Sequence, residues 1–565
     1  MSSRATHDPE YVRRVEDRLA SVEALLETLV PQLAVKRPGS QHVDDSQYLD
    51  CHVESGEDTI ASSLSQRLFA GKASSSNPDG HSTNAKAVDD KIDGMGSVAF
   101  ADEYVSGHFG ATSLLALSIK INQAMKEALA EMGQPNLMPD RDATNLISRP
   151  PSPSALAGEK SVSPPNFERL NIFGLPHRSR VMQLVDRFFS STGLIFPYIS
   201  KKAVLVPYAN INSSDSRNIR QSWLCLINTI MAFATVLSQS AERRKDAMAE
   251  ANLFLHRALK LLPDVAQQPA NLETLQALLL LTQYLQGSQR SMQTYNFQSV
   301  TTRVAFQLGI HCTTSSSKDT IIEREIKKRC WAMTFILDNR TCSMTFGRPP
   351  GIRNEYLSMQ TLLPVDVDAD GLEPANSSPN VLSLQTPTTS TVCCFIESVK
   401  LYEIVGSIID DIYQMNLVRD VDLEYNMLLE RVISLEVRLE AWKVKLPFPL
   451  HIRTRDEIVQ DPVDSSEYSR LSTVLTLRYL STRTLLHRAI LTRFLDQNHQ
   501  RATATGRSVF LRSSENISLD LSVSSAIEMI EIHYAMSKVS QRMLTTWWFS
   551  LYYGKNTVPS FDIWH

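Results

Sequence analysis

Cysteine is scarce in this sequence: 7 of the 565 residues are cysteine, at positions 51, 225, 312, 330, 342, 393 and 394. No two of them form the CxxC pair that is typical of structural zinc sites, and their spacing is too irregular for a disulfide framework in so long a chain. We therefore expect a reduced intracellular protein with no metal cofactor held by this chain.

The sequence also lacks a long uninterrupted apolar run. Its N-terminus, MSSRATHDPEYVRRVEDR, has no apolar stretch of the kind that a secretory signal needs. The longest apolar run, around residues 223 to 237, is interrupted by Asn228, Thr229 and Thr235. This run predicts a buried core helix, and we expect no membrane partner.

An excess of positive charge is missing as well. Lys and Arg number 57 against 61 Asp and Glu, which gives a net charge of −4. A DNA contact would therefore need a local basic patch. The dense basic run at 243–245 is flanked by Glu242 and Asp246, so it predicts a solvated helix face before it predicts a nucleic-acid surface.

Signatures of catalysis are absent from the sequence too. It contains no phosphate loop, no GxSxG and no HExxH. His256, His311 and His487 each lie in an apolar helical context, which is typical of structural histidines. The pair Asp410 and Asp411 lacks a third acidic residue at helical spacing. We predict that the protein is not an enzyme.

One loop partly resembles a calcium site. The stretch "DVDADG", residues 366 to 371, places acidic residues at the spacing that a calcium loop requires. Its twelfth position is Ser377 instead of a bidentate Glu, and Pro374 and Pro379 forbid the helix that should follow. The stretch therefore predicts a solvated acidic loop.

Among the features that are present, the first is a heptad pattern in residues 11 to 30, "YVRRVEDRLASVEALLETLV". Apolar residues alternate at spacings of three and four, the seam of a two-stranded coiled coil. These residues are Val12, Val15, Leu19, Val22, Leu26 and Leu29. We predict dimerisation through this helix; the alternative is an amphipathic helix that docks on its own chain.

Composition divides the whole chain into six parts. The expected parts are a coiled-coil dimerisation helix at 1–31, a disordered linker at 32–96, a helical island at 97–133, a Pro/Ser-rich linker at 134–174, a large helical domain at 175–553 and a C-terminal tail at 554–565. From about residue 176 the apolar residues recur with a period near 3.6 and hardly any strand-like alternation occurs. The predicted fold class is all-α.

A charged stretch followed by an apolar one, "EREIKKRCWAMTFILDN", lies at 323–339. Glu323 with Lys327, and Glu325 with Arg329, stand four residues apart with the acid first, the favourable order for ion pairs on one helix. The basic run is then neutralised within its own helix. This stretch predicts a helix that anchors a hydrophobic core, in preference to a recognition helix that binds in a DNA groove.

The end of that helix carries a further charged residue that needs a partner. Asp338 comes directly after the apolar half, and a buried carboxylate needs a partner, for which Arg348 is a candidate. Gly347 and the pair Pro349-Pro350 should stop the helix and fix the path of the chain.

Several stretches occur in an order that resembles the middle homology, or regulatory, domain of fungal binuclear-zinc-cluster transcription factors. They are "LETLQALLLLTQYLQGS" (272–288), "RVAFQLGIH" (303–311), "EREIKKRCW" (323–331) and "GRPPGI" (347–352), with weaker similarity at 175–201, at "LLHRAIL" (485–491) and at 547–548. The resemblance covers about two thirds of the chain. The matching positions are Arg303, Leu308, Gly309, His311, Glu325, Arg329, Trp331, Asp338, Gly347, Arg348 and Pro349. In the family these positions are architectural, and this chain departs from the pattern at Tyr295, Ser299 and Thr301.

The resemblance implies a nuclear regulator of transcription that controls a metabolic gene set through its helical domain. The family's DNA-binding module, six cysteines holding two zinc ions before the coiled coil, is missing from this sequence, which starts eleven residues before Val12. Either a truncated gene model has lost the ends, or the protein is a DNA-binding-deficient paralogue that acts as a dimerisation partner or modulator of full-length factors. The expected partners are a second copy or a related factor, the transcription machinery, and DNA only through a missing module or a partner. A helical enzyme is the third and weakest hypothesis.

Overall fold

The structure is a computed structural model of the 565-residue chain. It describes residues 109–131, 171–210, 219–236, 244–267, 269–288, 291–312, 319–357, 361–369, 390–417, 424–460, 466–497 and 509–539. The chain divides into two units, Met1–Arg67 and Leu68–His565, and every described residue lies in the second. The predicted dimerisation helix at 1–31 and the predicted linker at 32–96 lie outside the described residues, so both stay predictions.

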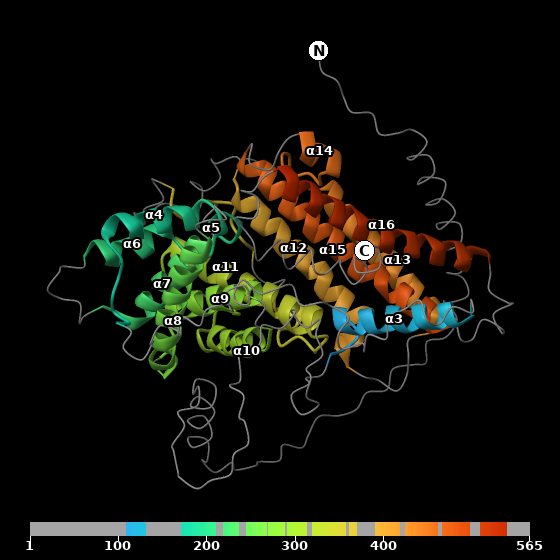
Figure 1. Cartoon of the computed structure of the whole chain (residues 1–565), viewed down its shortest axis with the longest axis horizontal. Helices are drawn as coiled ribbons and strands as arrows, with labels where there is room; N and C mark the ends of the chain where they lie inside the picture. The colour runs from blue at the N-terminus through green and yellow to red at the C-terminus, as the bar shows by residue number, and fades with distance from the viewer. Residues whose placement is uncertain are drawn as a thin grey trace, which may run out of the picture. The chain divides into compact units, whose positions relative to one another are not determined.

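Within the described ranges the fold is all-α, as predicted, and contains no strand. A first group of helices, drawn in green to yellow-green in Figure 1, comprises α4 (Arg178–Phe189), α5 (Thr192–Ile195), α6 (Lys201–Ala209), α7 (Gln221–Val236), α8 (Arg244–Gln267), α9 (Leu272–Gly287), α10 (Ser291–Gln307) and α11 (Ile321–Asp338). A second group comprises α12 (Val392–Asp411), α13 (Tyr425–Val444), α14 (Arg455–Gln460), α15 (Glu467–Gln497) and α16 (Val509–Val539). Short π or 3-10 turns add η6 (Asn339–Thr345), η7 (Asn354–Tyr356) and η10 (Gln414–Asn416). Helix α3 (Leu114–Glu131) precedes them all.

Helix α7 is the centre of the first group, because its sequence is apolar on nearly every side. Its residues from Ser222 to Thr235 are all buried, and the helix packs against α4, α8 and α9. The polar interruptions that the sequence showed bond to their own helix, since Asn228 and Thr229 donate hydrogen bonds to the carbonyls of Leu224 and Cys225, while the side-chain oxygen of Asn228 has no partner among the described residues. The run at 223–237 is therefore a core helix for its described part. Among the described helices, none has the length and apolar character that crossing a bilayer requires.

The start of α11 is fixed by a capping box. The Thr320 hydroxyl accepts a hydrogen bond from the Glu323 amide, and the Glu323 carboxylate accepts one from the Thr320 amide. Because this carboxylate turns back to the helix end, Lys327 pairs with Asp319 instead, at 2.7 Å. The predicted Glu323–Lys327 pair is wrong for that reason, whereas the neutralisation of the basic run holds.

The second predicted pair on α11 is confirmed, and it is buried. Arg329 Nε lies 2.9 Å from Glu325 Oε1, and the two side chains are 0% and 2% exposed. Beyond this pair every residue from Cys330 to Asp338 is buried, as the apolar half of the segment predicted. Helix α11 packs against α9, α10 and α12 and so joins the two groups of helices.

Helix α3 belongs to the same packed body as the second group. It packs against α15, and it is drawn in blue beside that helix in Figure 1. Lys120 on α3 also pairs with Asp496 on α15 at 2.6 Å. The sequence predicted a helix in this region but gave no sign of what it contacts.

Replacing Trp331 by Ala tests whether α11 anchors the core. The indole is 0% exposed and donates a hydrogen bond from Nε1 to the Tyr356 carbonyl at 3.1 Å. We expect Trp331→Ala to lower the free energy of unfolding by about 3 to 5 kcal/mol. Denaturant unfolding followed by circular dichroism measures it, with Ile321→Ala, at an exposed position of the same helix, as the control. Equal shifts in the two variants would show that α11 is peripheral.

Candidate functional site

The buried pair of Glu325 and Arg329 organises the loops around α11. Arg329 donates hydrogen bonds to the carbonyls of Pro197, Leu363 and Val365, at 3.1, 3.1 and 2.6 Å. Glu325 accepts a hydrogen bond from the Leu363 amide at 3.0 Å. The pair thus holds two distant chain segments on one helix. The hydrogen bonds of the pair go to each other and to backbone groups, and the second carboxylate oxygen of Glu325, Oε2, is buried without a hydrogen-bond partner among the described residues.

The described part of the acidic stretch, residues 366–369, serves the same architecture. Asp368 accepts hydrogen bonds from the Ser200 hydroxyl and from the amides of Lys201 and Lys202, at 2.6, 2.7 and 3.1 Å. These amides are the unpaired donors at the start of α6, where a carboxylate is electrostatically favoured. Asp368 is therefore a helix cap. In the described part of the chain no three His, Cys, Asp or Glu side chains could hold a metal ion together.

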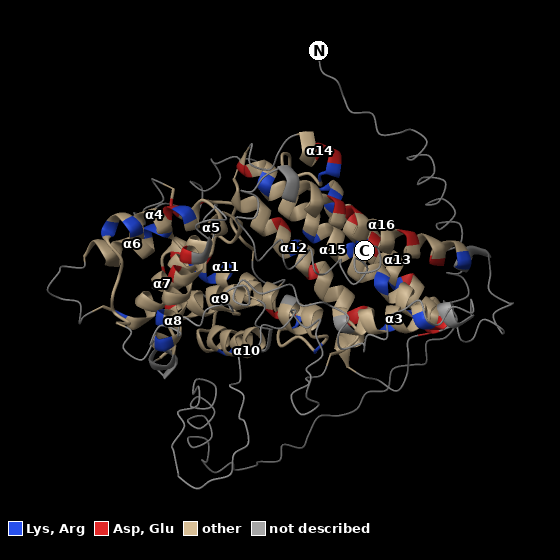
Figure 2. Cartoon of the chain, in the orientation of Figure 1, with Lys and Arg blue, Asp and Glu red and all other residues tan. Residues whose placement is uncertain are grey.

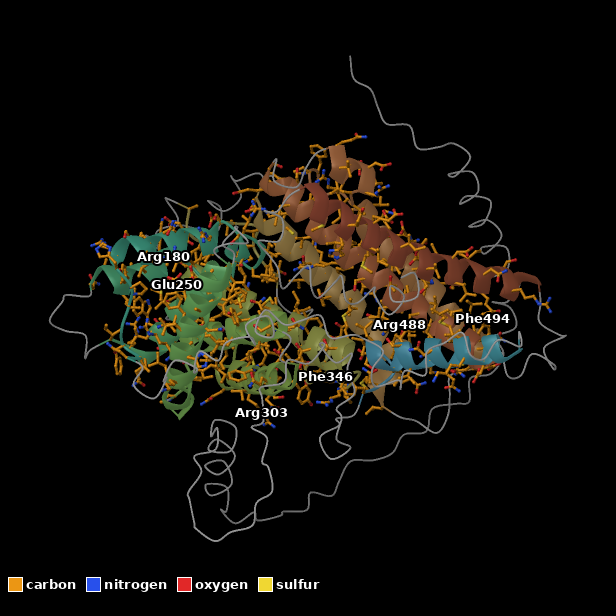
Figure 3. All side chains as sticks on the ribbon, in the orientation of Figure 1. Arg180, Glu250, Arg303, Phe346, Arg488 and Phe494 are labelled. Atoms are coloured by element: carbon orange, nitrogen blue, oxygen red, sulfur yellow. The ribbon has the colours of Figure 1, made fainter. Side chains whose placement is uncertain are left out.

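Three of the motif residues form or border an aromatic cluster where α10 ends. The Trp331 ring lies 5.5 Å from Phe306 and 5.9 Å from His311, centroid to centroid. Gly309, whose φ is +65°, turns the chain after α10 so that His311 can fold back onto Trp331. Arg303, in contrast, is exposed on α10 (Figure 3). His311 therefore packs against two aromatic rings of this cluster.

Asp338, at the end of α11, is satisfied by its neighbours in sequence. Its carboxylate accepts hydrogen bonds from the Ile352 amide at 2.8 Å and from the Cys342 thiol at 3.4 Å. Burial raises the pKa of Asp338 to about 6, although these hydrogen bonds oppose the rise. The carboxylate thus fixes the exit path of the chain after η6.

The predicted pair of Asp338 with Arg348 is therefore wrong. The Arg348 guanidinium lies 4.3 Å from the centre of the Tyr295 ring and 4.5 Å from that of the Phe346 ring. Tyr295 stands where the related family usually has Trp, and its face still offers the cation a favourable site. The neighbouring Pro349 is exposed.

The most constrained contact in this region is a crossing of two backbone segments at Gly110 and Gly347. The Gly110 amide donates a hydrogen bond to the Phe346 carbonyl at 2.9 Å, and the Phe109 ring stacks on Phe346. A Cβ on Gly110 would lie 1.9 Å from the Gly347 carbonyl oxygen. Gly347 itself has a φ of +66°, which disfavours any other residue. Two glycines are thus required for this approach.

Next to the crossing, each polar atom of Thr112 takes part in a hydrogen bond. Its amide and hydroxyl contact the Asn416 side-chain oxygen at 3.3 and 2.8 Å, and the hydroxyl also donates to the Ser343 carbonyl. Its own carbonyl accepts a hydrogen bond from Arg488 Nη2 at 2.6 Å. We call residues 109–113 the docking segment. It connects η6, η10 and α15 through hydrogen bonds.

A small cavity lies beside the docking segment, between α3, η6, α15 and α16. Its volume is about 20 Å³, and Thr112, Ser481 and Arg488 are among its walls. A cavity of this size holds about one water molecule, far less than a drug-sized ligand needs. This cavity is therefore too small to hold a large effector.

A cluster of three polar side chains resembles a catalytic triad, but it is buried and lacks access to a substrate. His487 Nδ1 lies 3.1 Å from the Ser518 hydroxyl, and His487 Nε2 lies 3.1 Å from a Glu436 carboxylate oxygen. Burial opposes ionisation of Glu436, yet the hydrogen bond from His487 and the charge of Arg483 hold the pKa of Glu436 below its usual range. Ser518 is 3% exposed in the middle of helix α16. This group joins α13, α15 and α16 structurally.

The cysteines of the described residues do not fit a zinc cluster. Cys225, Cys330 and Cys394 are buried on three different helices. Burial raises the pKa of the Cys225 and Cys394 thiols to about 12. In the metal-free protein these thiols therefore stay protonated near neutral pH.

The described helices carry charges of both signs. Figure 2 shows Lys and Arg interspersed with Asp and Glu along the helices. Several of these charges are paired across helices, as Arg180 on α4 is with Glu250 on α8 at 2.5 Å (Figure 3).

Sequence reasoning missed the docking segment and Arg488. The signal that could have found them was the amphipathic run "SLLALSIKINQAM" after Gly110, since a helix with an apolar face must bury it against something. No local pattern indicates which surface that is.

Over the described residues the architecture is an all-helical domain whose motif residues hold a core and its loops. Residues 185–444 match the model of the fungal specific transcription factor domain. The chain therefore carries a fungal specific transcription factor domain, as its motifs predicted.

Relatives along the chain agree with that assignment. Transcription factor FBD3 of Fusarium pseudograminearum is 26% identical over 570 residues, which is 96% of this chain and 71% of the relative. The sorbicillinoid biosynthetic cluster transcription factor 2 of Penicillium rubens is 23% identical over 67% of this chain and 53% of its own length. An ABC-transporter-regulating transcription factor of Aspergillus fumigatus is 26% identical over 52% of this chain and 31% of its own length. No solved structure matches the chain.

Replacing Gly110 by Ala tests the docking segment. Because the new Cβ would collide with the Gly347 carbonyl, we expect the segment and α3 to lose protection in hydrogen exchange while α11 keeps it. Ala111→Ser, at the exposed neighbouring position, is the control and should leave the exchange pattern unchanged. Undiminished protection of residues 109–131 in Gly110→Ala would contradict the crossing.

The raised pKa of Asp338 predicts a pH dependence of stability. The folded value of about 6 exceeds the unfolded value of about 3.9, so the folded state binds the extra proton between these two pH values. Wild-type stability should therefore fall by about 3 kcal/mol relative to Asp338→Asn as the pH rises from about 4 to about 6, and then level off. Denaturant unfolding of both proteins across this range measures the difference. A constant difference would show that Asp338 does not titrate in the folded protein.

Proposed function

We propose that the protein is a nuclear regulator of transcription that controls a metabolic gene set through its helical domain. The observation that carries this proposal is the match of residues 185–444 to the fungal specific transcription factor domain. Two relatives support the metabolic part of it, since their names assign them to a biosynthetic gene cluster and to the regulation of an ABC transporter. Which genes are controlled follows from neither.

The geometry supports a regulatory role for the domain over an enzymatic one. Its motif residues pair with each other and with backbone groups inside the core, as Glu325 and Arg329 do. The nearest approach to a catalytic group, at Ser518 and His487, has no opening for a substrate. A domain of this kind acts through its contacts and through the arrangement of its helices.

A second candidate function is that of a modulator that dimerises with full-length factors. It is favoured by the absence of any CxxC pair in this sequence and by the heptad series that starts at Val12. In both versions DNA recognition comes from a zinc-cluster module outside this sequence or from the dimer partner. The transcription machinery is the further partner that the proposal implies.

RNA sequencing of a strain that lacks the gene tests the regulatory proposal. We expect altered transcripts for a group of genes with a shared metabolic task, restored by the wild-type gene. Complementation with Trp331→Ala should fail, because its core is destabilised. The control Ile321→Ala should complement. An unchanged transcript profile in the deletion strain would contradict regulation of any gene set under the growth conditions used.

The dimer seam is tested by Leu19→Asp combined with Leu26→Asp. Charges at two seam positions should abolish self-association of the full chain in multi-angle light scattering. The matched control places the same charges outside the seam, as Ser21→Asp with Thr28→Asp. An identical mass for all three proteins would refute dimerisation through residues 11 to 30.

A further inference from the structure

Arg488 is a buried cation that faces no acidic side chain among the described residues. It is 5% exposed, and its Nη2 donates to the carbonyl of Thr112, which is neutral, at 2.6 Å. Its only other described contact is with the Tyr413 ring, whose centre lies 5.9 Å away. The buried Arg329 and the partly buried Arg483, in contrast, each have a carboxylate within 3 Å. A buried charge without a full counter-charge is costly, so Arg488 requires compensation from another source.

The cavity beside the docking segment provides the space for such compensation. Arg488 lines it together with Thr112, Ser481 and Thr484, and its other walls are apolar side chains such as Leu114 and Met529. None of its walls is acidic. The Nε atom of Arg488 is buried and has no hydrogen-bond partner in the described structure. A buried guanidinium with an unused donor next to a small, partly open cavity is an arrangement that an anion can satisfy.

The hydroxyl groups around the cavity favour the same ligand. The hydroxyls of Thr112 and Thr484 donate to the carbonyls of Ser343 and Leu480. Ser481 is 6% exposed, and among the described contacts its hydroxyl makes no hydrogen bond. It can therefore donate to a ligand in the cavity. With an Arg and a hydroxyl as donors and apolar groups elsewhere, the cavity is suited to an acceptor that carries negative charge.

We propose that this cavity binds a single small inorganic anion of the size of chloride, held by Arg488 and Ser481. The volume of about 20 Å³ sets the size of the ligand, because it fits one water-sized particle and excludes larger organic acids. Since Arg488 also holds the carbonyl of Thr112, the bound anion stabilises the docking segment on the helical domain. The site is thus an anion-dependent link between residues 109–131 and α15.

Thermal unfolding of the full chain in increasing chloride tests the proposal. Sodium gluconate keeps the ionic strength constant, because this anion is too large for the cavity. We expect the unfolding midpoint to rise with chloride and to saturate, as for a ligand that binds only the folded state. Arg488→Met should weaken chloride binding at least about tenfold. Arg303→Met removes a charge of the same sign from an exposed position (Figure 3) and should leave the response unchanged.

A second variant and a direct measurement guard against a folding defect in Arg488→Met. Ser481→Ala leaves the contacts of Arg488 to Thr112 and Tyr413 in place and should weaken chloride binding several-fold. Crystals of the full chain grown in bromide should show anomalous density in the cavity between α3 and α15. A chloride response that is the same in Arg488→Met and Arg303→Met, or a cavity without bromide, would overturn the proposal.

Discussion

The ion pair of Glu325 and Arg329 is the interaction on which the rest of this domain depends. Both side chains are buried, so loss of either would leave an uncompensated charge in the core, at a cost of about 3 to 5 kcal/mol. Arg329 also binds the carbonyls of Leu363 and Val365, which position the stretch that carries Asp368. Asp368 in turn caps α6. One pair on α11 therefore determines the path of a loop and the start of a helix far away in sequence.

The other end of α11 is held by a different kind of interaction. Asp338 accepts hydrogen bonds from groups that follow it closely in sequence, and so it fixes the turn that leads to Gly347. This turn is the surface that the docking segment crosses at Gly110. The two ends of one helix thus organise the loops of the first helical group and the contact with the N-terminal part of the described chain.

The predictions from sequence failed where several nearby groups compete for the same charged side chain, and they succeeded elsewhere. The all-α fold, the buried run of α7 and the pair of Glu325 and Arg329 came from spacing alone. The pairing of Glu323 with Lys327 was wrong because unpaired amides at the start of a helix compete for the same carboxylate. The pairing of Asp338 with Arg348 was wrong because backbone and thiol donors lie closer to the carboxylate, and aromatic rings lie closer to the guanidinium. Each error concerns the choice of partner and leaves the helix itself unchanged.

The sequence by itself determined the helices, their buried faces and the family-like order of motifs, because these depend on residues three or four positions apart. Only the tertiary structure decided that the docking segment crosses Gly347 and that Arg488 meets the carbonyl of Thr112, 376 positions away. No periodicity encodes such a contact. It requires two glycine backbones and a buried guanidinium to meet in space, and their positions follow from the packing of all the helices between them.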